Sequence, residues 1–180
     1  MDAGHAVLGL ASISRSGPYL DISNKSCCQK IIVTGKKGKT SSAVQLKGTL
    51  PEVDKAPGDV LRQGRWFSAA ENEAKANVCV IGDSVRDAYF PYGSPLGETI
   101  SIGGEDYRVV GTLQKREQLF GGGGGDNAHS TVIYVPLSTA LQIKPHAEDD
   151  LILSIAIDGR LAKAKEDVQA TLRIHQRVKL

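Results

Sequence analysis

Residues 98–113 read ETISIGGEDYRVVGTL, and they decide the fold class of this 180-residue chain more firmly than any other stretch. Apolar and polar residues alternate on both sides of Gly103 and Gly104, the pattern of two strands that each bury one face. Paired glycines suit the turn between them because glycine adopts positive φ without strain. We therefore expect a β-hairpin formed by residues 98–102 and 106–113. The side chains expected to share its inward face are Ile100, Ile102, Tyr107, Val109 and Leu113.

A buried strand and a helix precede this hairpin. Residues 78–81 read VCVI, a short apolar run typical of a buried strand, and Gly82 breaks it. Asp83 is a suitable N-cap for a helix that Pro91 ends. The side chains that this helix should turn inward are Val85, Ala88, Tyr89 and Phe90.

The N-terminal part of the chain reads as one helix followed by short strands. The hydrophobic spacing predicts a helix over residues 2–10, and the expected strands cover residues 19–23, 30–34 and 43–49. Residues 51–64 have no period and contain Pro51, Pro57 and Gly58, so they read as an irregular crossing. A capping box then follows, formed by Ser68 and Glu71, which predicts one or two helical turns.

The C-terminal part reads as strands followed by a helix. Residues 132–135 are a strand that Pro136 ends, and residues 151–157 alternate as a second strand. The apolar stripe expected on the final helix consists of Leu161, Ala164, Val168 and Leu172. The mixture of strands, hairpin and scattered helices predicts an α+β fold with a largely antiparallel sheet.

Composition excludes several classes of protein. The 22 Lys and Arg nearly balance the 20 Asp and Glu, and the net charge of +2 is too small to bind nucleic acid through phosphate neutralisation. The longest apolar runs fall far short of the ~20 residues that cross a bilayer. The three cysteines, Cys27, Cys28 and Cys79, are too few for a disulfide scaffold. The chain therefore reads as an ordinary globular domain.

Two motifs invite a chemical interpretation. Gly38-Lys39-Thr40 resembles the end of a phosphate-binding loop, but Val33 stands where the first glycine is required, so a basic hairpin tip is favoured. Gly82-Asp83-Ser84 and a D-x-x-H over residues 126–129 mimic a GDS-type serine esterase. There Ser84 attacks an ester, His129 accepts its proton and Asp126 orients the imidazole. We keep this esterase as the alternative hypothesis.

Other chemistry has weaker support in the sequence. The four histidines, at positions 5, 129, 146 and 175, have no metal-ligand spacing with one another or with the cysteines. We therefore predict no catalytic residue, no metal site and no cofactor.

A run of five glycines lies between two apolar side chains and a polar stretch. Glycine loses the most backbone entropy when it is fixed, so residues 114–130 are expected to form a mobile loop. Leu119 and Phe120 come directly before the glycines. We predict that Leu119, Phe120, Gly121 and Gly125 contact a partner, with a tolerated surface insertion as the alternative.

The segment from residue 61 to 139 resembles the extracytoplasmic core domain of MacB/FtsX-type ABC transporter permeases. The blocks that carry the resemblance are LRQGRWFS (61–68), VCVIG (78–82), AYFP (88–91), PLGETISI (95–102) with Gly104, YRVVGTL (107–113) and VIYVPL (132–137). The resemblance implies a porter-like subdomain, residues 1–56 and 131–180, into which a second α+β subdomain, residues 57–130, is inserted.

The resemblance also implies a function. Such a domain lies between two membrane helices, outside the cytoplasmic membrane, and performs no bond chemistry. It relays ATP-driven motion to a substrate or partner protein, in efflux, lipoprotein handling or mechanotransmission. The expected partners are the rest of the permease, a second permease copy, a cytoplasmic ATPase domain or subunit, and a periplasmic adaptor or lipoprotein. No nucleic acid is expected among them.

Overall fold

The computed structural model describes residues 13–21, 32–34, 40–41, 44–51, 60–114, 130–143, 151–157 and 159–178. The predicted helix over residues 2–10 lies outside them. The strands are β1 (Ile13–Asp21), β2 (Val33–Thr34), β3 (Thr40–Ser41), β4 (Gln45–Thr49), β5 (Leu61–Gly64), β6 (Val78–Ile81), β7 (Thr99–Ile102), β8 (Glu105–Leu113), β9 (Val132–Pro136) and β10 (Leu151–Ala156). The helices are α2 (Ala69–Glu73), α3 (Asp83–Tyr89), α5 (Leu137–Ile143) and α6 (Leu161–Val178).

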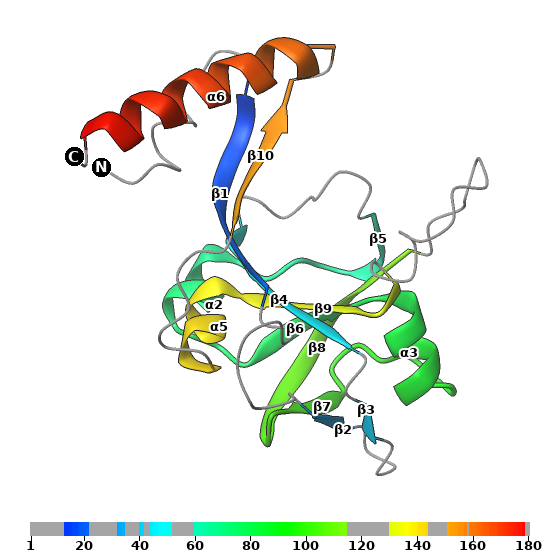
Figure 1. Ribbon diagram of the computed structural model, residues 1–180. Helices are drawn as coiled ribbons and strands as arrows, with labels where there is room; N and C mark the ends of the chain where they lie inside the picture. Colours follow the sequence, from blue (N-terminus) through cyan, green and yellow to red (C-terminus); the bar gives the residue numbers. More distant parts are fainter. Residues whose placement is uncertain are drawn as a thin grey trace.

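These ten strands form one curled sheet with the order β10-β1-β4-β9-β6-β8-β7-β2-β3, and β5 pairs with β8 (Figure 1). Two pairs are parallel, β4 with β9 and β6 with β8, and the other pairs described are antiparallel. The predicted α+β class and largely antiparallel sheet are therefore confirmed. Strands β1 and β10 extend from the body of the sheet toward α6, at the top of Figure 1.

The sheet buries two separate groups of apolar side chains. The first cluster lies under α3 and α5, which add Val85, Tyr89, Leu137 and Ala140 to buried side chains such as Ile81 and Ile133. The second cluster consists of Phe67, Val78, Val80, Leu113, Val132 and Tyr134, with Trp66 packed against it. Alternate residues of β6 supply both clusters, Cys79 and Ile81 the first, Val78 and Val80 the second. This strand is fully buried, as the sequence predicts.

The predicted hairpin exists, but one of its side chains faces the wrong way for strict alternation. β7 and β8 pair antiparallel, with Ile100 opposite Tyr107. The register of β8 against β6 then shifts between Val109 and Gly111. Side chains of a strand alternate between the two faces of the sheet. An extra residue in one strand therefore moves each later side chain to the opposite face from the one that strict alternation predicts. Leu113 therefore packs in the second cluster, whereas Tyr107 and Val109 pack in the first.

Other element predictions need correction at their ends. α3 has Gly82 as its N-cap instead of Asp83, since the carbonyl of Gly82 accepts the first helical hydrogen bond, from the amide of Arg86 at 2.9 Å. The amide of Gly82 donates to the carbonyl of Val132 at 2.8 Å, which fixes the residue between strand and helix. Strand β5 lies in the stretch predicted to be irregular, and α5 follows Pro136 directly where no helix was predicted.

The final helix is present, and its stripe is only partly covered. Ala164 is 3% exposed, but Leu161, the first residue of the predicted stripe, is 76% exposed. Leu161 is the first residue of α6. Leu161 was therefore wrongly assigned to the buried face.

Candidate functional site

The most highly organised set of contacts in the described chain joins the edge strand β5 to helix α2. Gly64 ends β5 with φ of 77°, a left-handed backbone that favours glycine. A Cβ atom at Gly64 would lie 2.2 Å from the carbonyl oxygen of Val110, and one at Gly111, its partner in register, 2.5 Å from the carbonyl oxygen of Arg65. Both glycines are therefore needed for β5 and β8 to approach. We call residues 64–71 the edge junction.

The edge junction inserts two aromatic rings into the second cluster. Phe67 is 2% exposed. The ring of Trp66 meets that of Phe67 edge to face, with centroids 5.9 Å apart, and lies 5.4 Å from the ring of Tyr134 on β9. Aromatic pairs in such tilted geometries contribute about 0.5–1.5 kcal/mol beyond the area they bury. The junction thus covers a sheet face to which α2 itself contributes no buried residue.

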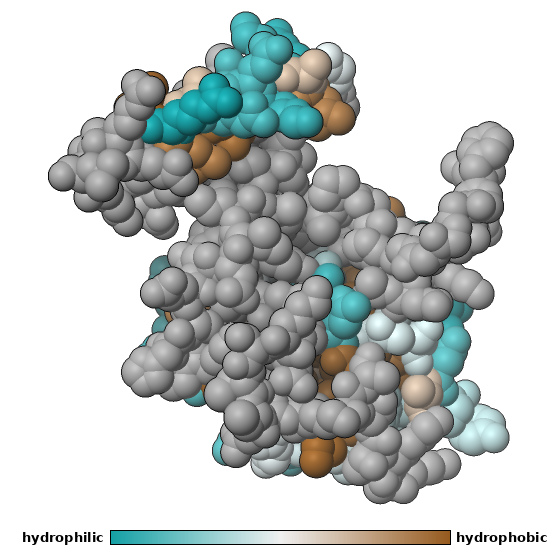
Figure 2. Space-filling view, viewed as in Figure 1, coloured by the Kyte–Doolittle hydropathy of each residue, from teal (hydrophilic) through white to brown (hydrophobic). Residues whose placement is uncertain are grey.

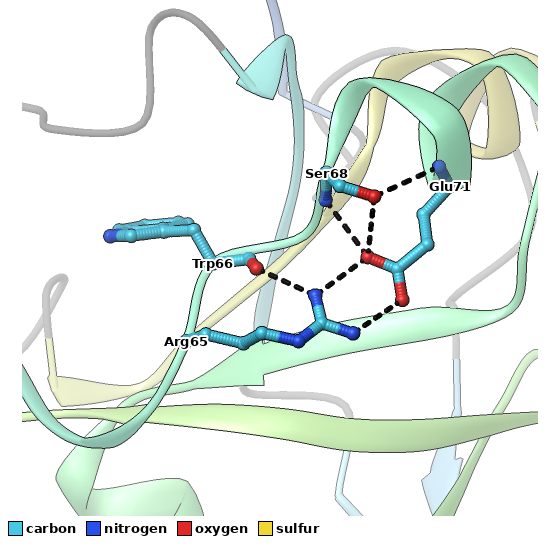
Figure 3. Close-up of polar contacts among 4 residues, drawn as sticks. All are labelled: Arg65, Trp66, Ser68 and Glu71. Atoms are coloured by element: carbon cyan, nitrogen blue, oxygen red, sulfur yellow. Dashed lines mark hydrogen bonds and ion pairs between the residues drawn. The ribbon is translucent and has the colours of Figure 1, made fainter.

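A charged clamp closes the junction (Figure 3). The two terminal nitrogens of Arg65 donate to the carboxylate oxygens of Glu71 at 2.7 and 2.8 Å, and one of them also donates to the carbonyl of Trp66 at 2.9 Å. Glu71 also accepts from the amide and hydroxyl of Ser68, at 2.8 and 3.1 Å. The amide of Glu71 donates to the Ser68 hydroxyl at 3.2 Å, which completes the predicted capping box.

This clamp strongly favours the ionised carboxylate. Hydrogen bonds from Arg65 lower the pKa of Glu71 to about 2, opposed by partial burial and assisted by the Ser68 amide. Hydrogen bonding to Glu71 in turn raises the pKa of Arg65. A bidentate Arg–carboxylate pair adds geometric specificity as well as energy. The side chain of Glu71 is 17% exposed and that of Arg65 56%, so solvent screens part of the attraction.

Helix α2 is tied in turn to α5. The amide and hydroxyl of Ser138 donate to the side-chain oxygen of Asn72 at 3.1 and 3.0 Å, and the hydroxyl also donates to the Asn72 carbonyl. The hydroxyl of Thr139 donates to the carbonyl of Ala76 at 3.1 Å. Polar contacts therefore connect the residue that follows β5, through α2, to α5.

The titrating groups described near the core are suited to packing rather than to proton transfer. Burial raises the pKa of the Cys79 thiol far above neutrality, so the thiolate is disfavoured. Burial, with the charge of Glu105 as a smaller cause, raises the pKa of Tyr107 to about 12. Among the residues that the structure describes, no group of three or more His, Cys, Asp or Glu could hold a metal ion.

The structure reaches only part of the predicted sites. Ser84, the proposed esterase nucleophile, is exposed and is the second residue of α3. Asp126 and His129 lie outside the described residues, as do the predicted partner contacts Leu119, Phe120, Gly121 and Gly125. Within the described ranges, no helix is long and apolar enough to span a bilayer.

Sequence reasoning missed the role of Arg65 and of Gly111. The S-x-x-E spacing revealed the capping box, but nothing in the sequence says that an arginine six residues before Glu71 completes it. A glycine inside an alternating strand was the available signal for Gly111, since such a residue often marks a bulge or a close backbone approach.

The fold is similar to that of two solved structures. The crystal structure of the periplasmic region of MacB from Actinobacillus actinomycetemcomitans superimposes with a TM-score of 0.71 at 19% identity, covering 95% of this chain and 71% of that one. The extracellular domain of the noncanonic ABC-type transporter YknZ from Gram-positive bacteria gives 0.68 at 14% identity, covering 97% and 82%. At these identities the likeness concerns the fold.

Relatives found by sequence comparison are also MacB proteins. The macrolide export ATP-binding/permease protein MacB of Shewanella oneidensis is 29% identical over 135 residues, which are 72% of this chain and 19% of that protein. Its counterpart from Bdellovibrio bacteriovorus is 33% identical over 97 residues, 54% of this chain and 14% of that protein. The chain therefore spans less than a fifth of the length of each relative. Neither the structural nor the sequence comparison supports the esterase hypothesis. Because the family described as the MacB-like periplasmic core domain matches residues 10–173, the chain belongs to that family.

Proposed function

We propose that this chain is the extracytoplasmic domain of an ABC transporter permease and that it relays ATP-driven motion of membrane helices to a substrate or partner protein outside the membrane. Membership of the MacB-like periplasmic core domain family supports the location. The pairing of Ile13 with Ala156 supports the proposed insertion between two membrane helices. A domain inserted between two membrane helices needs its entrance and exit side by side, and β1 and β10 provide them.

The relay works by rigid-body movement and makes or breaks no covalent bond. Motion entering through β1 and β10 passes to β4 and then, through the parallel β4–β9 pair, to the body of the sheet. The edge junction and the Asn72–Ser138 contacts then hold β5, α2 and α5 in one arrangement. Packed elements of this kind shift as units instead of deforming continuously.

We retain the division into residues 1–56 with 131–180 and residues 57–130 as part of the proposal. Strands β1, β4, β9 and β10 of the first unit form one end of the sheet, next to β6, β8 and β7 of the second unit, with β5 paired to β8. β2 and β3, which also belong to the first unit, lie beyond β7 at the other end of the sheet. The units therefore pair at two places, β9 with β6 and β2 with β7, and a hinge that keeps both pairs must bend the sheet at both.

The partners follow from the same location. We propose that the rest of the permease, a second permease copy and a cytoplasmic ATPase domain or subunit act together with this domain, and that a periplasmic adaptor or lipoprotein receives the motion. Leu119, Phe120, Gly121 and Gly125 are the proposed contact residues. Deleting residues 121–125 from the full-length permease should reduce export while ATP hydrolysis continues, and unchanged export would remove this role.

One experiment tests the relay directly. In the full-length permease, residues 14–155 are replaced by a short Gly-Ser linker, which the geometry permits because paired residues of an antiparallel ladder lie about 5 Å apart. A macrolide serves as the transport probe, since the relatives are named for macrolide export. We expect ATP hydrolysis to persist and export to stop. Persistent export contradicts the proposal, and loss of ATP hydrolysis assigns the domain to assembly instead of relay.

A further inference from the structure

Strand β2 connects the two units of the sheet at the end opposite to their main connection. The sheet order places β6, β8 and β7 of the second unit between β9 on one side and β2 with β3 on the other. Strand β3 ends at Ser41 and β4 begins at Gln45, so these two ends lie within about 14 Å of each other whatever path the chain takes. The first unit therefore holds the second unit from both ends.

Residues 32–34, which we call the strap, make few contacts with the second unit. The amide of Gly103 donates a hydrogen bond to the carbonyl of Ile32 at 3.0 Å, and the hydroxyl of Tyr89 on α3 donates one to the carbonyl of Val33 at 3.2 Å. Of the three side chains of the strap, only that of Val33 is buried, and Ile32 is 53% exposed. Figure 2 shows hydrophobic side chains at the surface in the lower part of the view, where Figure 1 draws β2 and β7.

The other connection between the units is better buried. Where β9 pairs with β6, the two register positions bring together four buried side chains, those of Val80, Ile81, Ile133 and Tyr134. Where β2 pairs with β7, Thr34 and its register partner Ser101 are only half-buried. Local opening is easiest where few apolar contacts are buried and backbone hydrogen bonds lie near solvent. Of the two connections, the strap is therefore the one that opens first.

We propose that the strap detaches from β7 when ATP-driven motion turns the second unit relative to the first, and that it pairs again when the units return. This inference rests on the proposed function and on its division into two units. While both connections hold, the sheet must bend at two places, whereas after release it bends only where β9 pairs with β6. The short link from β3 to β4 keeps the released strap close to β7, which favours pairing again.

A disulfide that holds the strap on β7 tests the proposal in the full-length permease. Thr34 and Ser101 are register partners on neighbouring antiparallel strands, whose spacing of about 5 Å a disulfide can bridge. The variant carries Thr34→Cys and Ser101→Cys, with Cys27→Ser and Cys28→Ser to prevent other pairings. We expect oxidation to reduce macrolide export at least tenfold while ATP hydrolysis continues, and we expect dithiothreitol to restore export. Loss of free thiols confirms the cross-link.

The matched control joins the same cysteine to a partner inside the second unit. Asp106 lies opposite Ser101 on the other neighbouring strand, where β7 pairs with β8. The variant with Ser101→Cys and Asp106→Cys, in the same background, should therefore export normally when it is oxidised. The proposal is overturned if the oxidised Thr34 and Ser101 variant exports normally, or if both cross-links reduce export equally.

Hydrogen exchange provides a second measurement that does not depend on export. The amide of Gly103 reports the strap, and the amide of Gly97, which donates to the carbonyl of Val109 at 2.8 Å within the second unit, is its control. Adding ATP to the full-length permease should accelerate exchange at Gly103 about tenfold and leave Gly97 unchanged. If the Gly-Ser replacement of residues 14–155 still exports, the proposed function fails, but this exchange still decides whether the strap opens. Equal behaviour of the two amides overturns the release of the strap.

Discussion

The two buried clusters are stabilised in different ways. The first has helices on its surface and consists of fully buried side chains such as Ile81, Ile100 and Ile133, so burial of apolar area is its main source of stability. The second is smaller and is covered by the edge junction, which packs against Gly111 of β8. There the two glycines, the two aromatic rings and the charged clamp must all be in place. The second cluster therefore depends on backbone geometry and polar contacts in addition to buried apolar area.

Substituting the glycine of the edge junction should break the second cluster most severely. Gly64 and Gly97 have nearly equal φ angles of 77° and 80°, but a Cβ at Gly97 would meet nothing within 4 Å. We expect Gly97→Ala to lower the free energy of unfolding by about 1–2 kcal/mol, the cost of a left-handed non-glycine residue. Gly64→Ala adds a clash with the Val110 carbonyl and should cost about 4 kcal/mol. Urea denaturation measures both, and equal losses would refute the role of close approach.

Removing the Phe67 ring should have the second largest effect on the free energy of unfolding. Phe67→Ala leaves a cavity under the edge junction and should reduce the free energy of unfolding by about 3–4 kcal/mol. Hydrogen exchange should then increase in β5 and α2 more than in α3, because the first cluster remains packed. Uniform acceleration across both helices would show that the two clusters unfold as one unit.

The charged clamp should contribute less. Glu71→Gln keeps the shape of the side chain but removes the charge that Arg65 binds, and we expect a loss of about 1 kcal/mol, because the Arg65 guanidinium is largely exposed. Glu73→Gln is the matched control, since Glu73 is exposed in the same helix. A difference below about 0.3 kcal/mol between the two variants in thermal denaturation would reduce the clamp to a surface contact.

The same pair predicts a small pH dependence. Because the pKa of Glu71 falls from 4.5 to about 2 on folding, the unfolded chain binds more protons, so the contribution is complete above pH 4.5 and disappears as the pH falls toward 2. The difference in stability between the natural chain and Glu71→Gln should therefore shrink over that interval. A difference that stays constant from pH 6 to pH 3 would mean that the carboxylate charge is not what stabilises the junction.

Patterns among residues close in sequence correctly predicted three elements of the fold. The hairpin, the VCVI strand and the Ser68–Glu71 capping box each depend on residues close in sequence, and each is present. The bulge in β8 was missed because alternation gives no sign of an inserted residue except Gly111. Strand β5 was not predicted because Arg62, Gln63 and Gly64 are exposed at a sheet edge and show no alternation of apolar residues. The resemblance to transporter domains supplied the family and the basis of the proposed function, which no single motif indicates.

The antiparallel pairing of β1 with β10 has a mechanical consequence. A force that separates their adjacent ends, at Ile13 and Ala156, acts across the ladder and loads its hydrogen bonds one after another, like a zipper. A force along the parallel β4–β9 pair instead loads five register positions together, in shear. The β1–β10 pair therefore opens at a lower force than the β4–β9 pair. Under the proposed function, this pair transmits forces directed along its strands, and a force that separates its two ends would open it before the two clusters are strained.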